Sequence, residues 1–315
     1  MALPRYNSIN AALKKRFGCK VFKVSLEGGF GCPNRDGKIS TSGCAFCNEE
    51  AYLTKTLSPN LLDGIEYVKR RHGAAKFISY FQSGTNTYGP VKILKPLFEA
   101  AIDHPDVVGL AIGTRPDCIT AENADLLEGL SRRTMLWVEL GLQSANNETL
   151  RRINRGHTAF DFRNAAGILK QRNIPVVAHV ILGLPGESIQ DMHETAKFIN
   201  ETDIDGVKIH NLHVLKGTGL EKLYNEGKIE LPALETYATW VADFLEQLKP
   251  SILIHRVNGH APRHLTIAPQ WSINKLAIFN AVERELKRRN TYQGCHSEAS
   301  PKNPRNPRDS SRSLP

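Results

Sequence analysis

The sequence predicts an α/β protein, a partial (β/α)6 barrel of the TIM type with a C-terminal extension. Short runs rich in β-branched and aromatic residues alternate with longer amphipathic stretches, which is the pattern of βα units around a parallel sheet. Six or seven such units in about 240 residues suit one open or closed barrel better than two domains. Because the chain has no internal repeat or interdomain linker, we expect one barrel domain over residues 1–294.

The elements of this barrel can be placed in order along the chain. Strands are expected at residues 20–26, 77–82, 107–113, 135–142, 176–182, 206–214 and 252–257. Helices are expected near residues 61–72, 90–103, 121–131, 159–172, 188–201 and 234–248, with a last helix from about 273 to 289. The first six strands each precede a helix, so the seventh strand and the last helix form the predicted C-terminal extension.

The composition is that of an ordinary globular chain. Its 315 residues are 41% hydrophobic and 23% charged, which supplies enough apolar material for a sizeable core. No apolar run approaches the roughly 18 residues that cross a bilayer, and the N-terminal segment lacks the apolar stretch of a signal peptide. We therefore expect a cytoplasmic protein with no membrane partner. After Gly294 the composition shifts to Ser, Pro, Asn and Arg, which predicts a disordered basic tail over residues 295–315.

The net charge of +9 and the pI of about 9.2 favour a polyanionic partner. The excess is spread over several clusters, at residues 14–16, 151–155 and 284–289. These clusters are expected either to line a phosphate-binding face or to be solvated helix faces.

Three of the six cysteines lie close together in the sequence. Cys32, Cys44 and Cys47 form the pattern C-x11-C-x2-C, whereas Cys19, Cys118 and Cys295 stand alone. Thiolates are the soft ligands of zinc and of iron–sulfur clusters. A structural zinc site normally has a fourth Cys or His ligand, and no second C-x2-C is present. Three thiolates leave one metal position open, as catalysis requires.

Further segments extend this pattern along the chain: FQSGTNTY at 81–88, IGTRPDCI at 112–119, VELGLQSANNETLRRINRGHT at 138–158, HVILGLPGES at 179–188, KIHNLHVLKGT at 208–218 and RVNGHAPR at 256–263. Together with the cysteine loop GCPNRDGKISTSGCAFC, they resemble the radical S-adenosylmethionine (SAM) superfamily. Within it, the chain is similar to the YhcC-like proteins, which resemble the radical domain of the elongator catalytic subunit. The resemblance covers about residues 5–294 and implies the barrel fold.

The resemblance implies two cofactors, a [4Fe-4S] cluster on Cys32, Cys44 and Cys47 and a SAM molecule bound to its fourth iron. Reductive cleavage of SAM would release a 5′-deoxyadenosyl radical that abstracts a substrate hydrogen, with electrons from a donor such as flavodoxin or ferredoxin. Two departures from the superfamily pattern stand out. The loop is longer than the common C-x3-C-x2-C, and Gln82-Ser83-Gly84-Thr85 replaces the usual Gly-Gly-Glu.

Several residues in these motifs are candidate contacts to SAM. In the strand WVELGLQS, alternation places Glu139 and Gln143 on the face that points into the barrel, where a charge is costly unless it meets a ligand or an ion pair. The alternative is a buried pair that holds the barrel together. The resemblance extends the cofactor-binding set to Gln82, Ser83, Thr114, Arg115, Glu139, Gln143, Arg155, His179, Gly183 and Gly186. His179 could equally be a hydrogen-bonded core histidine.

The candidate catalytic residues are Cys118, Lys208 and His210. Lys208 and His210 alternate in a strand and are expected to face the cavity, and Cys118 follows a strand end, where an inert packing role is the alternative. With His255, Arg256, His260 and Arg263 they would form a basic rim at the C-terminal side of the last strands. Such a rim suits an anionic substrate, although exposed loop residues without a role give the same pattern.

Three functions follow from these features. Similarity to the elongator radical domain, together with the positive charge, favours a tRNA substrate and tailoring of a wobble uridine. The second hypothesis is a porphyrinogen-oxidase-like enzyme with a small anionic substrate. The third is a zinc-stabilised RNA-binding barrel without catalysis.

Overall fold

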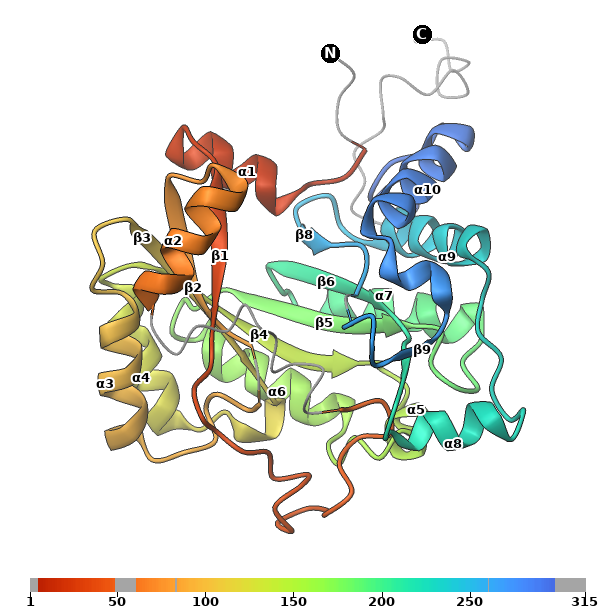
Figure 1. Ribbon diagram of the computed structural model, residues 1–315, viewed down its shortest axis with the longest axis horizontal. Helices are drawn as coiled ribbons and strands as arrows, with labels where there is room; N and C mark the ends of the chain where they lie inside the picture. Colours follow the sequence, from red (N-terminus) through yellow and green to blue (C-terminus); the bar gives the residue numbers. More distant parts are fainter. Residues whose placement is uncertain (1–4, 49–60, 83, 260, 298–315) are drawn as a thin grey trace, which may run out of the picture.

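The computed structural model shows a seven-stranded parallel sheet that curls into a half barrel, with helices on its outer face (Figure 1). It describes residues 5–48, 61–82, 84–259 and 261–297. The strand order is β1-β2-β3-β4-β5-β6-β8, and all neighbours are parallel. The strands of this sheet are β1 (Val21–Leu26), β2 (Lys76–Phe81), β3 (Val107–Thr114), β4 (Met135–Gln143), β5 (Val176–Leu182), β6 (Gly206–Asn211) and β8 (Leu253–Arg256). The predicted fold class and order of strands are confirmed.

The helices of the βα units also lie where the sequence predicts them. They are α2 (Leu61–His72), α3 (Val91–Ala101), α4 (Ala121–Ser131), α6 (Ala159–Lys170), α7 (Ile189–Glu201), α9 (Leu234–Gln247) and, in the C-terminal extension, α10 (Lys275–Arg288). Thr120, Thr158 and Ser188 start three of them with capping boxes, in which side chain and backbone satisfy each other's N–H groups. None of the helices described is long and apolar enough to span a membrane.

The sequence pattern did not predict several short elements. They are α1 (Ile9–Phe17), α5 (Asn147–Arg152), α8 (Gly219–Asn225), the 3-10 helices Pro116–Cys118 and Gln270–Ile273, and two short strands, β7 (Val214–Leu215) and β9 (Thr266–Ala268). The strand expected over residues 206–214 is wrong in its last three residues, 212–214. β6 ends at Asn211, whose side chain accepts a hydrogen bond from the Gly259 backbone, and β7 pairs antiparallel with β9 in a separate ribbon.

Two apolar clusters determine where a site can lie. The larger one fills the space between the outer face of the sheet and the helices, with Phe98, Leu127 and Phe162 fully buried. The smaller one lies inside the curl of the sheet, where Ile9 and Leu13 of α1 pack on inward residues of the strands. Because α1 closes the amino end of the barrel, polar chemistry is confined to the middle and the carboxyl end.

The edges and ends of the sheet are tied to neighbouring segments. The backbone N–H of Ile254 in β8 donates to Asn7 O at 2.7 Å, so residues 7 and 8 cover that edge. At the C-terminus, Gly294 and His296 donate backbone hydrogen bonds to Leu245 O and Glu246 O of α9. The tail predicted from residue 295 therefore begins too early, since residues 295–297 are packed on α9. The remainder, 298–315, lies outside the described residues.

Candidate active site

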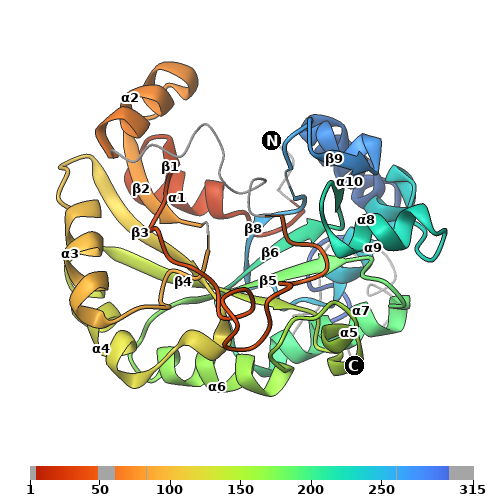
Figure 2. The same ribbon diagram turned by 60° about the horizontal axis from the view of Figure 1, so that its bottom comes forward.

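The loop after β1, which carries the three clustered cysteines, lies across the carboxyl ends of the strands beside α5 and α8 (Figure 2). Ala45 N donates to Ile153 O just after α5, and Leu220 N of α8 donates to Ala45 O, both at 2.9 Å. Cys47 N donates to Cys44 O, also at 2.9 Å. These bonds fix the C-x2-C pair at the end of the barrel where βα enzymes build their active sites.

The sulfur of Cys44 already accepts two N–H donors. Asn34 Nδ2 lies 3.4 Å from Cys44 Sγ and Arg155 Nη1 lies 3.5 Å from it. Burial raises the pKa of Cys47, and the neighbouring thiols of Cys44 and Cys32 raise it further. Three thiols in one loop at this end of the sheet are suited to binding a metal centre, whose positive charge would favour the thiolates.

The sulfurs of the three clustered cysteines are not closed around a single ion in this structure. Among the described residues, the sulfurs of Cys32, Cys44 and Cys47 do not all lie within 4.8 Å of one another, whereas a zinc ion with Zn–S bonds of about 2.3 Å would hold three sulfurs about 3.8 Å apart. Three thiols in one loop are a donor set that suits an iron–sulfur cluster.

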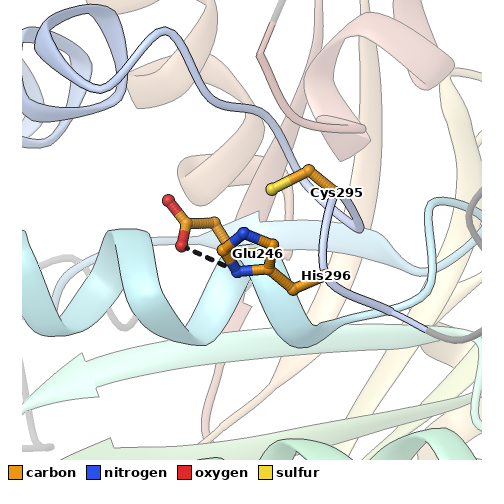
Figure 3. Close-up of side chains that lie close together, drawn as sticks. All are labelled: Glu246, Cys295 and His296. Carbon is orange, nitrogen blue, oxygen red and sulfur yellow. Dashed lines mark ion pairs between the residues drawn. The ribbon is translucent and has the colours of Figure 1, made fainter. Parts of the chain in front are cut away.

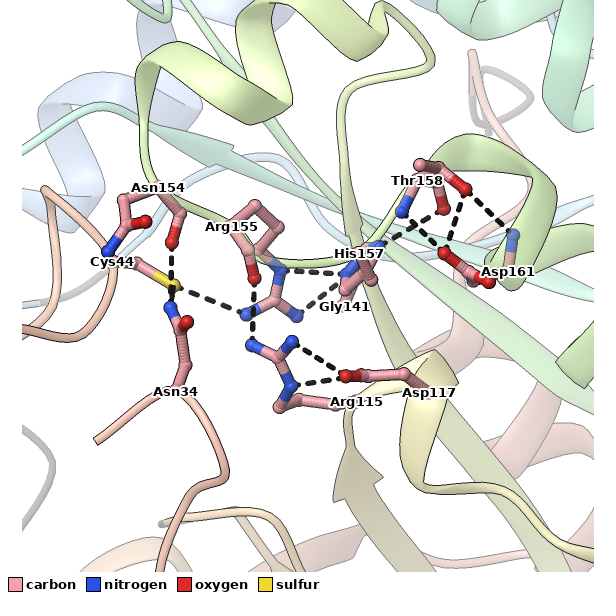
Figure 4. A network of polar contacts seen from close by, with 10 residues as sticks. All are labelled: Asn34, Cys44, Arg115, Asp117, Gly141, Asn154, Arg155, His157, Thr158 and Asp161. Atoms are coloured by element: carbon pink, nitrogen blue, oxygen red, sulfur yellow. Dashed lines mark hydrogen bonds and ion pairs between the residues drawn. The ribbon is translucent and has the colours of Figure 1, made fainter. Parts of the chain in front are cut away.

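Arg155 connects the cysteine loop to the sheet (Figure 4). Its Nη2 donates to Gly141 O of β4 at 2.8 Å, and its Nε donates to His157 Nε2 at 2.8 Å. Burial, followed by the charges of Arg155 and Arg115, lowers the pKa of His157 to about 3, so the ring is neutral and accepts this bond. Because one guanidinium contacts both the Cys44 sulfur and the β4 backbone, it fixes the loop on the barrel.

Arg115 supports Arg155 from the end of β3. Its Nη1 donates to Arg155 O at 2.9 Å, and it forms a bidentate pair with Asp117 at 2.9 and 2.8 Å. Gly156 is confined beside them, since a side-chain carbon there would lie 2.8 Å from Asn34 Oδ1. In this structure Arg115 and Arg155, predicted as SAM contacts, are held by protein partners at the cysteine loop, and their contact to SAM stays a prediction.

The other candidates at the ends of β2 and β3 lie in the same region. Thr114 and Thr87 share a hydrogen bond of 2.6 Å, and Thr87 Oγ1 donates to Cys118 O at 2.9 Å. Burial and the neighbouring Asp117 raise the pKa of Cys118 to about 12, so its thiol stays protonated. Gln82 is half-buried, and Ser83 lies outside the described residues. A catalytic role for Cys118 stays a prediction.

Glu139, in the middle of β4, accepts five hydrogen bonds inside the barrel. Its Oε1 accepts from Lys23 Nζ at 2.6 Å and Trp137 Nε1 at 3.0 Å. Its Oε2 accepts from Tyr80 Oη, His179 Nε2 and Lys208 Nζ, each at 2.7 Å. Lys208 also donates to Tyr80 Oη at 2.6 Å. We call Lys23, Tyr80, Trp137, Glu139, His179 and Lys208 the Glu139 cluster.

This saturation changes the interpretation of Glu139. Burial alone would raise its pKa, but Lys208, Lys23 and His179 hold the pKa well below its usual value, so the group is a carboxylate. Its two oxygens accept five hydrogen bonds from protein donors, which favours the alternative, a buried ionic group that joins strands. The expectation that Glu139 contacts SAM stays a prediction. Lys208 and His179 belong to the same cluster, since both donate a hydrogen bond to Glu139 Oε2.

Gln143 and the glycines of the GLPGE turn lie near the carboxyl end of the sheet. Gln143 follows a register shift in β4 and has a left-handed backbone, φ 71°. A side-chain carbon at Gly141 would lie 2.8 Å from Gln143 Nε2. Gln143 therefore lies on the same face of β4 as Gly141, as alternation predicts. Gly183 and Gly186 also have left-handed backbones and border a pocket of about 160 Å³. Their contacts to SAM stay predictions.

The predicted basic rim is only partly present. Lys208 is bound to Glu139, and His255 is buried against Trp137 with a ring distance of 5.5 Å. Arg263 is exposed, and His260 lies outside the described residues. His210 and Arg256 remain as inward or half-buried groups of the rim.

Two of the three basic clusters have partners within the protein. In residues 151–155, Arg151 pairs with Glu148 and Arg155 is buried at Cys44. In residues 284–289, Arg288 pairs with Glu285 and Arg289 with Asp243. Arg151, Arg288 and Arg289 thus have acidic neighbours one helical turn or one helix away, which a count of basic residues alone does not reveal, and binding of a polyanion by this face stays a prediction. Residues 14–16 are exposed, as expected.

The isolated Cys295 lies in another polar group, at the C-terminal end of α9 (Figure 3). The ligand atoms of Glu246, Cys295 and His296 lie within 4.8 Å of one another. Glu246 also pairs with Arg289 at 3.3 Å, and its other oxygen lies 3.3 Å from His296 Nδ1. Since Arg289 already balances the carboxylate, this group anchors the C-terminal segment on α9.

The sequence reasoning missed Lys23, Tyr80, Asn34 and His157. Lys23 and Tyr80 had a detectable signal, because both occupy inward positions of strands that alternation identifies. Asn34 and His157 had none beyond their place in the motifs, since their partners come from loops distant in sequence.

Comparison with known proteins identifies the family that uses this arrangement. Residues 26–199 match the model of the radical SAM superfamily. The chain belongs to the radical SAM superfamily. Residues 204–288 match the model of the radical SAM C-terminal domain. As in the rest of the family, the cofactors of this enzyme are a [4Fe-4S] cluster and SAM. That Cys32, Cys44 and Cys47 bind the cluster stays a prediction.

Relatives of this radical SAM chain match nearly its full length. YtqA of Bacillus subtilis is 42% identical over 296 residues, covering 92% of this chain and 92% of YtqA. YhcC of Escherichia coli K12 is 36% identical over 286 residues, covering 89% and 92%. The archaeal Elp3 of Methanocaldococcus infernus, without its N-terminus, has a TM-score of 0.67 at 19% identity, covering 87% of this chain and 64% of Elp3. This last likeness shows the fold.

Replacing Cys44 by Ser should lower the iron and sulfide content of anaerobically purified protein and abolish SAM cleavage, because Cys44 lies in the loop at ligand spacing. Cys295→Ser is the matched control and should retain both. Iron and sulfide analysis with the visible absorbance of the cluster measures the effect. A full cluster in Cys44→Ser would refute the ligand assignment.

Replacing Glu139 by Gln should lower the free energy of unfolding by about 3–5 kcal/mol, because it leaves Lys208 and Lys23 without a counter-charge in the interior. The double variant Glu139→Gln with Lys208→Met should recover part of that loss. Chemical unfolding measures both. If Glu139→Gln unfolds like the wild type but no longer binds SAM, Glu139 serves SAM binding and not folding.

His179 should make stability depend on pH. Burial and the charge of Lys208 lower the pKa of His179 from 6.5 to about 4. Between these two pH values the imidazole is protonated in the unfolded chain and neutral in the folded chain. Stability should therefore fall as the pH falls from about 6.5 to about 4. Urea unfolding across this range measures the slope, and His179→Gln, which keeps an N–H donor, should reduce it. An unchanged slope would contradict the assignment.

Proposed function

We propose that this chain is a radical SAM enzyme that abstracts a hydrogen atom from a tRNA substrate, at or near a wobble uridine. The observation that carries the radical chemistry is the cysteine loop fixed at the carboxyl end of the half barrel by Arg155. The choice of tRNA is supported by the elongator-like motifs at residues 138–158 and 179–188 and by the likeness in fold to Elp3.

The cluster and SAM, when bound, supply the electron and the hydrogen-abstracting group. The chain's own residues then have three tasks. Arg155 and Asn34 donate to the Cys44 sulfur and hold the loop in place. The apolar cluster under α1 keeps water from entering through the amino end of the barrel. The Glu139 cluster separates that apolar plug from the reactive end and fixes the strands around it.

The electron donor is proposed to be a small redox protein such as flavodoxin or ferredoxin. It would approach the outer side of the cysteine loop, where Arg35, Asp36 and Lys38 are partly or fully exposed.

A small anionic substrate is the second candidate. It is favoured by one observation, that Arg256 at the inner edge of the sheet makes no hydrogen bond or ion pair with any described residue. This candidate would need no extended basic surface.

The tRNA proposal predicts altered nucleosides in cells that lack the protein. Digests of tRNA from a deletion strain should contain an unprocessed wobble uridine that the wild-type gene restores and Cys44→Ser does not. Filter binding across a salt series tests the surface. Six exposed basic residues on α1 and α2, Lys14, Lys15, Arg16, Lys69, Arg70 and Arg71, would together give a slope of log K against log salt of about −5 if all six contacted phosphates. Unchanged nucleosides, with equal competition by DNA, would leave the small-molecule substrate.

A further inference from the structure

The interior edge formed by β6 and β8 carries more basic than acidic side chains. Lys23, Lys208 and Arg256 lie around Glu139, which is the single acidic side chain of the described interior cluster. Lys23 and Lys208 both bind the Glu139 carboxylate. Arg256 is therefore the basic group for which the cluster supplies no counter-charge.

The sheet register turns Arg256 toward the interior. Lys208 of β6 is paired with Arg256 of β8, after a register shift between Val207 and Lys208. Residues paired across neighbouring strands point to the same face, and Lys208 points inward to Glu139. Arg256 thus brings five N–H donors to the inner edge of the sheet, and none of them has a partner among the described residues.

His210 lies two residues beyond Lys208 on the same face of β6. Its Nε2 is buried and has no hydrogen-bond partner in the described part of the chain. Its ring lies 5.3 Å from that of His179. Burial, and then the charge of Arg256, lowers the pKa of His210 well below its usual value, so the neutral ring can offer one N–H. A buried nitrogen without a partner is costly, and a ligand atom would satisfy it.

A third basic group, Lys275, begins α10 and makes no ion pair within the described residues. Its side chain is exposed for the most part. Partial burial, and then the charge of Arg256, lower the pKa of Lys275, which is consistent with the two cations lying on the same side of the sheet edge. Two neighbouring cations with no acidic side chain between them create a positive potential, and such a potential attracts an anion.

We propose that Arg256, flanked by His210 and Lys275, binds an anionic group of the substrate, a phosphate or a carboxylate, at the β8 edge of the half barrel. The proposal rests on the proposed radical SAM function, whose substrate must lie at this open end. This site is smaller than the basic rim that the sequence predicts, because Lys208 is bound to Glu139 and His255 is buried against Trp137. Arg256 offers the bidentate geometry that planar and tetrahedral oxyanions prefer.

Binding of two simple probes tests the site without turnover. Inorganic phosphate and acetate are titrated into the anaerobic cluster-bound enzyme at fixed ionic strength, by calorimetry, in wild type and variants. Arg256→Met should weaken binding of the preferred probe about tenfold, and Arg256→Lys should weaken it less, because a charge without the fork remains. Lys275→Met should also weaken it, through loss of one charge. Arg132→Met, at an exposed arginine that caps the C-terminal end of α4, is the matched control and should bind as the wild type does.

The two probes distinguish the source of the anion. Preference for phosphate supports a backbone or ester phosphate, and preference for acetate supports a carboxylate carried by the reacting group. If neither probe binds, or if folded Arg256→Met and Lys275→Met both bind like Arg132→Met, the site is refuted. Should Arg256→Met fail to fold, Arg256→Lys and Lys275→Met decide the question.

The result is separable from the proposed function. The same variants are assayed for apparent Kd with tRNA from the deletion strain, whose nucleosides are analysed independently. Unchanged nucleosides together with loss of anion binding in Arg256→Met would remove tRNA and keep the anion site. Changed nucleosides with unaltered anion binding would remove the anion site and keep tRNA.

Discussion

One buried carboxylate joins most of the half barrel. Glu139 of β4 is bonded to Lys23 of β1, Tyr80 of β2, His179 of β5 and Lys208 of β6. An open sheet lacks the continuous hydrogen bonding that closes a full barrel, so its curvature needs support from inside. Because the donors come from strands on both sides of β4, the cluster resists flattening of the sheet. The desolvation cost of the charges is offset only while all partners are present.

The reactive end depends on a second cation, Arg155, which is placed by its neighbours rather than by a strand. The guanidinium spans from the Cys44 sulfur to Gly141 O, and Arg115 holds the Arg155 backbone from β3. Gly141 must lack a side chain because Arg155 fills that space. The loop position is therefore coupled to β4, and β4 is held by Glu139. Sheet curvature and placement of the cysteines are linked through one strand.

Much of this could be predicted from the sequence, and the parts that could not share a cause. The strand and helix order follows from local periodicity, and the cysteine ligands follow from spacing within one loop. Alternation correctly directed Glu139, Lys208 and His210 inward. It could not tell that Lys23 and Tyr80 meet Glu139, because that depends on register across β1, β2 and β4. Likewise, it could not tell that Arg151, Arg288 and Arg289 pair with acids on neighbouring turns or helices.

The layers of the interior suggest how specificity and radical chemistry are kept apart. Apolar side chains under α1 fill the amino end, the Glu139 cluster fills the middle, and the cysteine loop covers the carboxyl end. Charges in the middle are paired with one another in this structure. Arg256 and His210 differ because they lie at the β6–β8 edge, where the sheet ends and paired partners run out. A substrate entering from the open side would meet unpaired donors there before it reached the cysteine loop, which separates recognition of charge from the site of hydrogen abstraction.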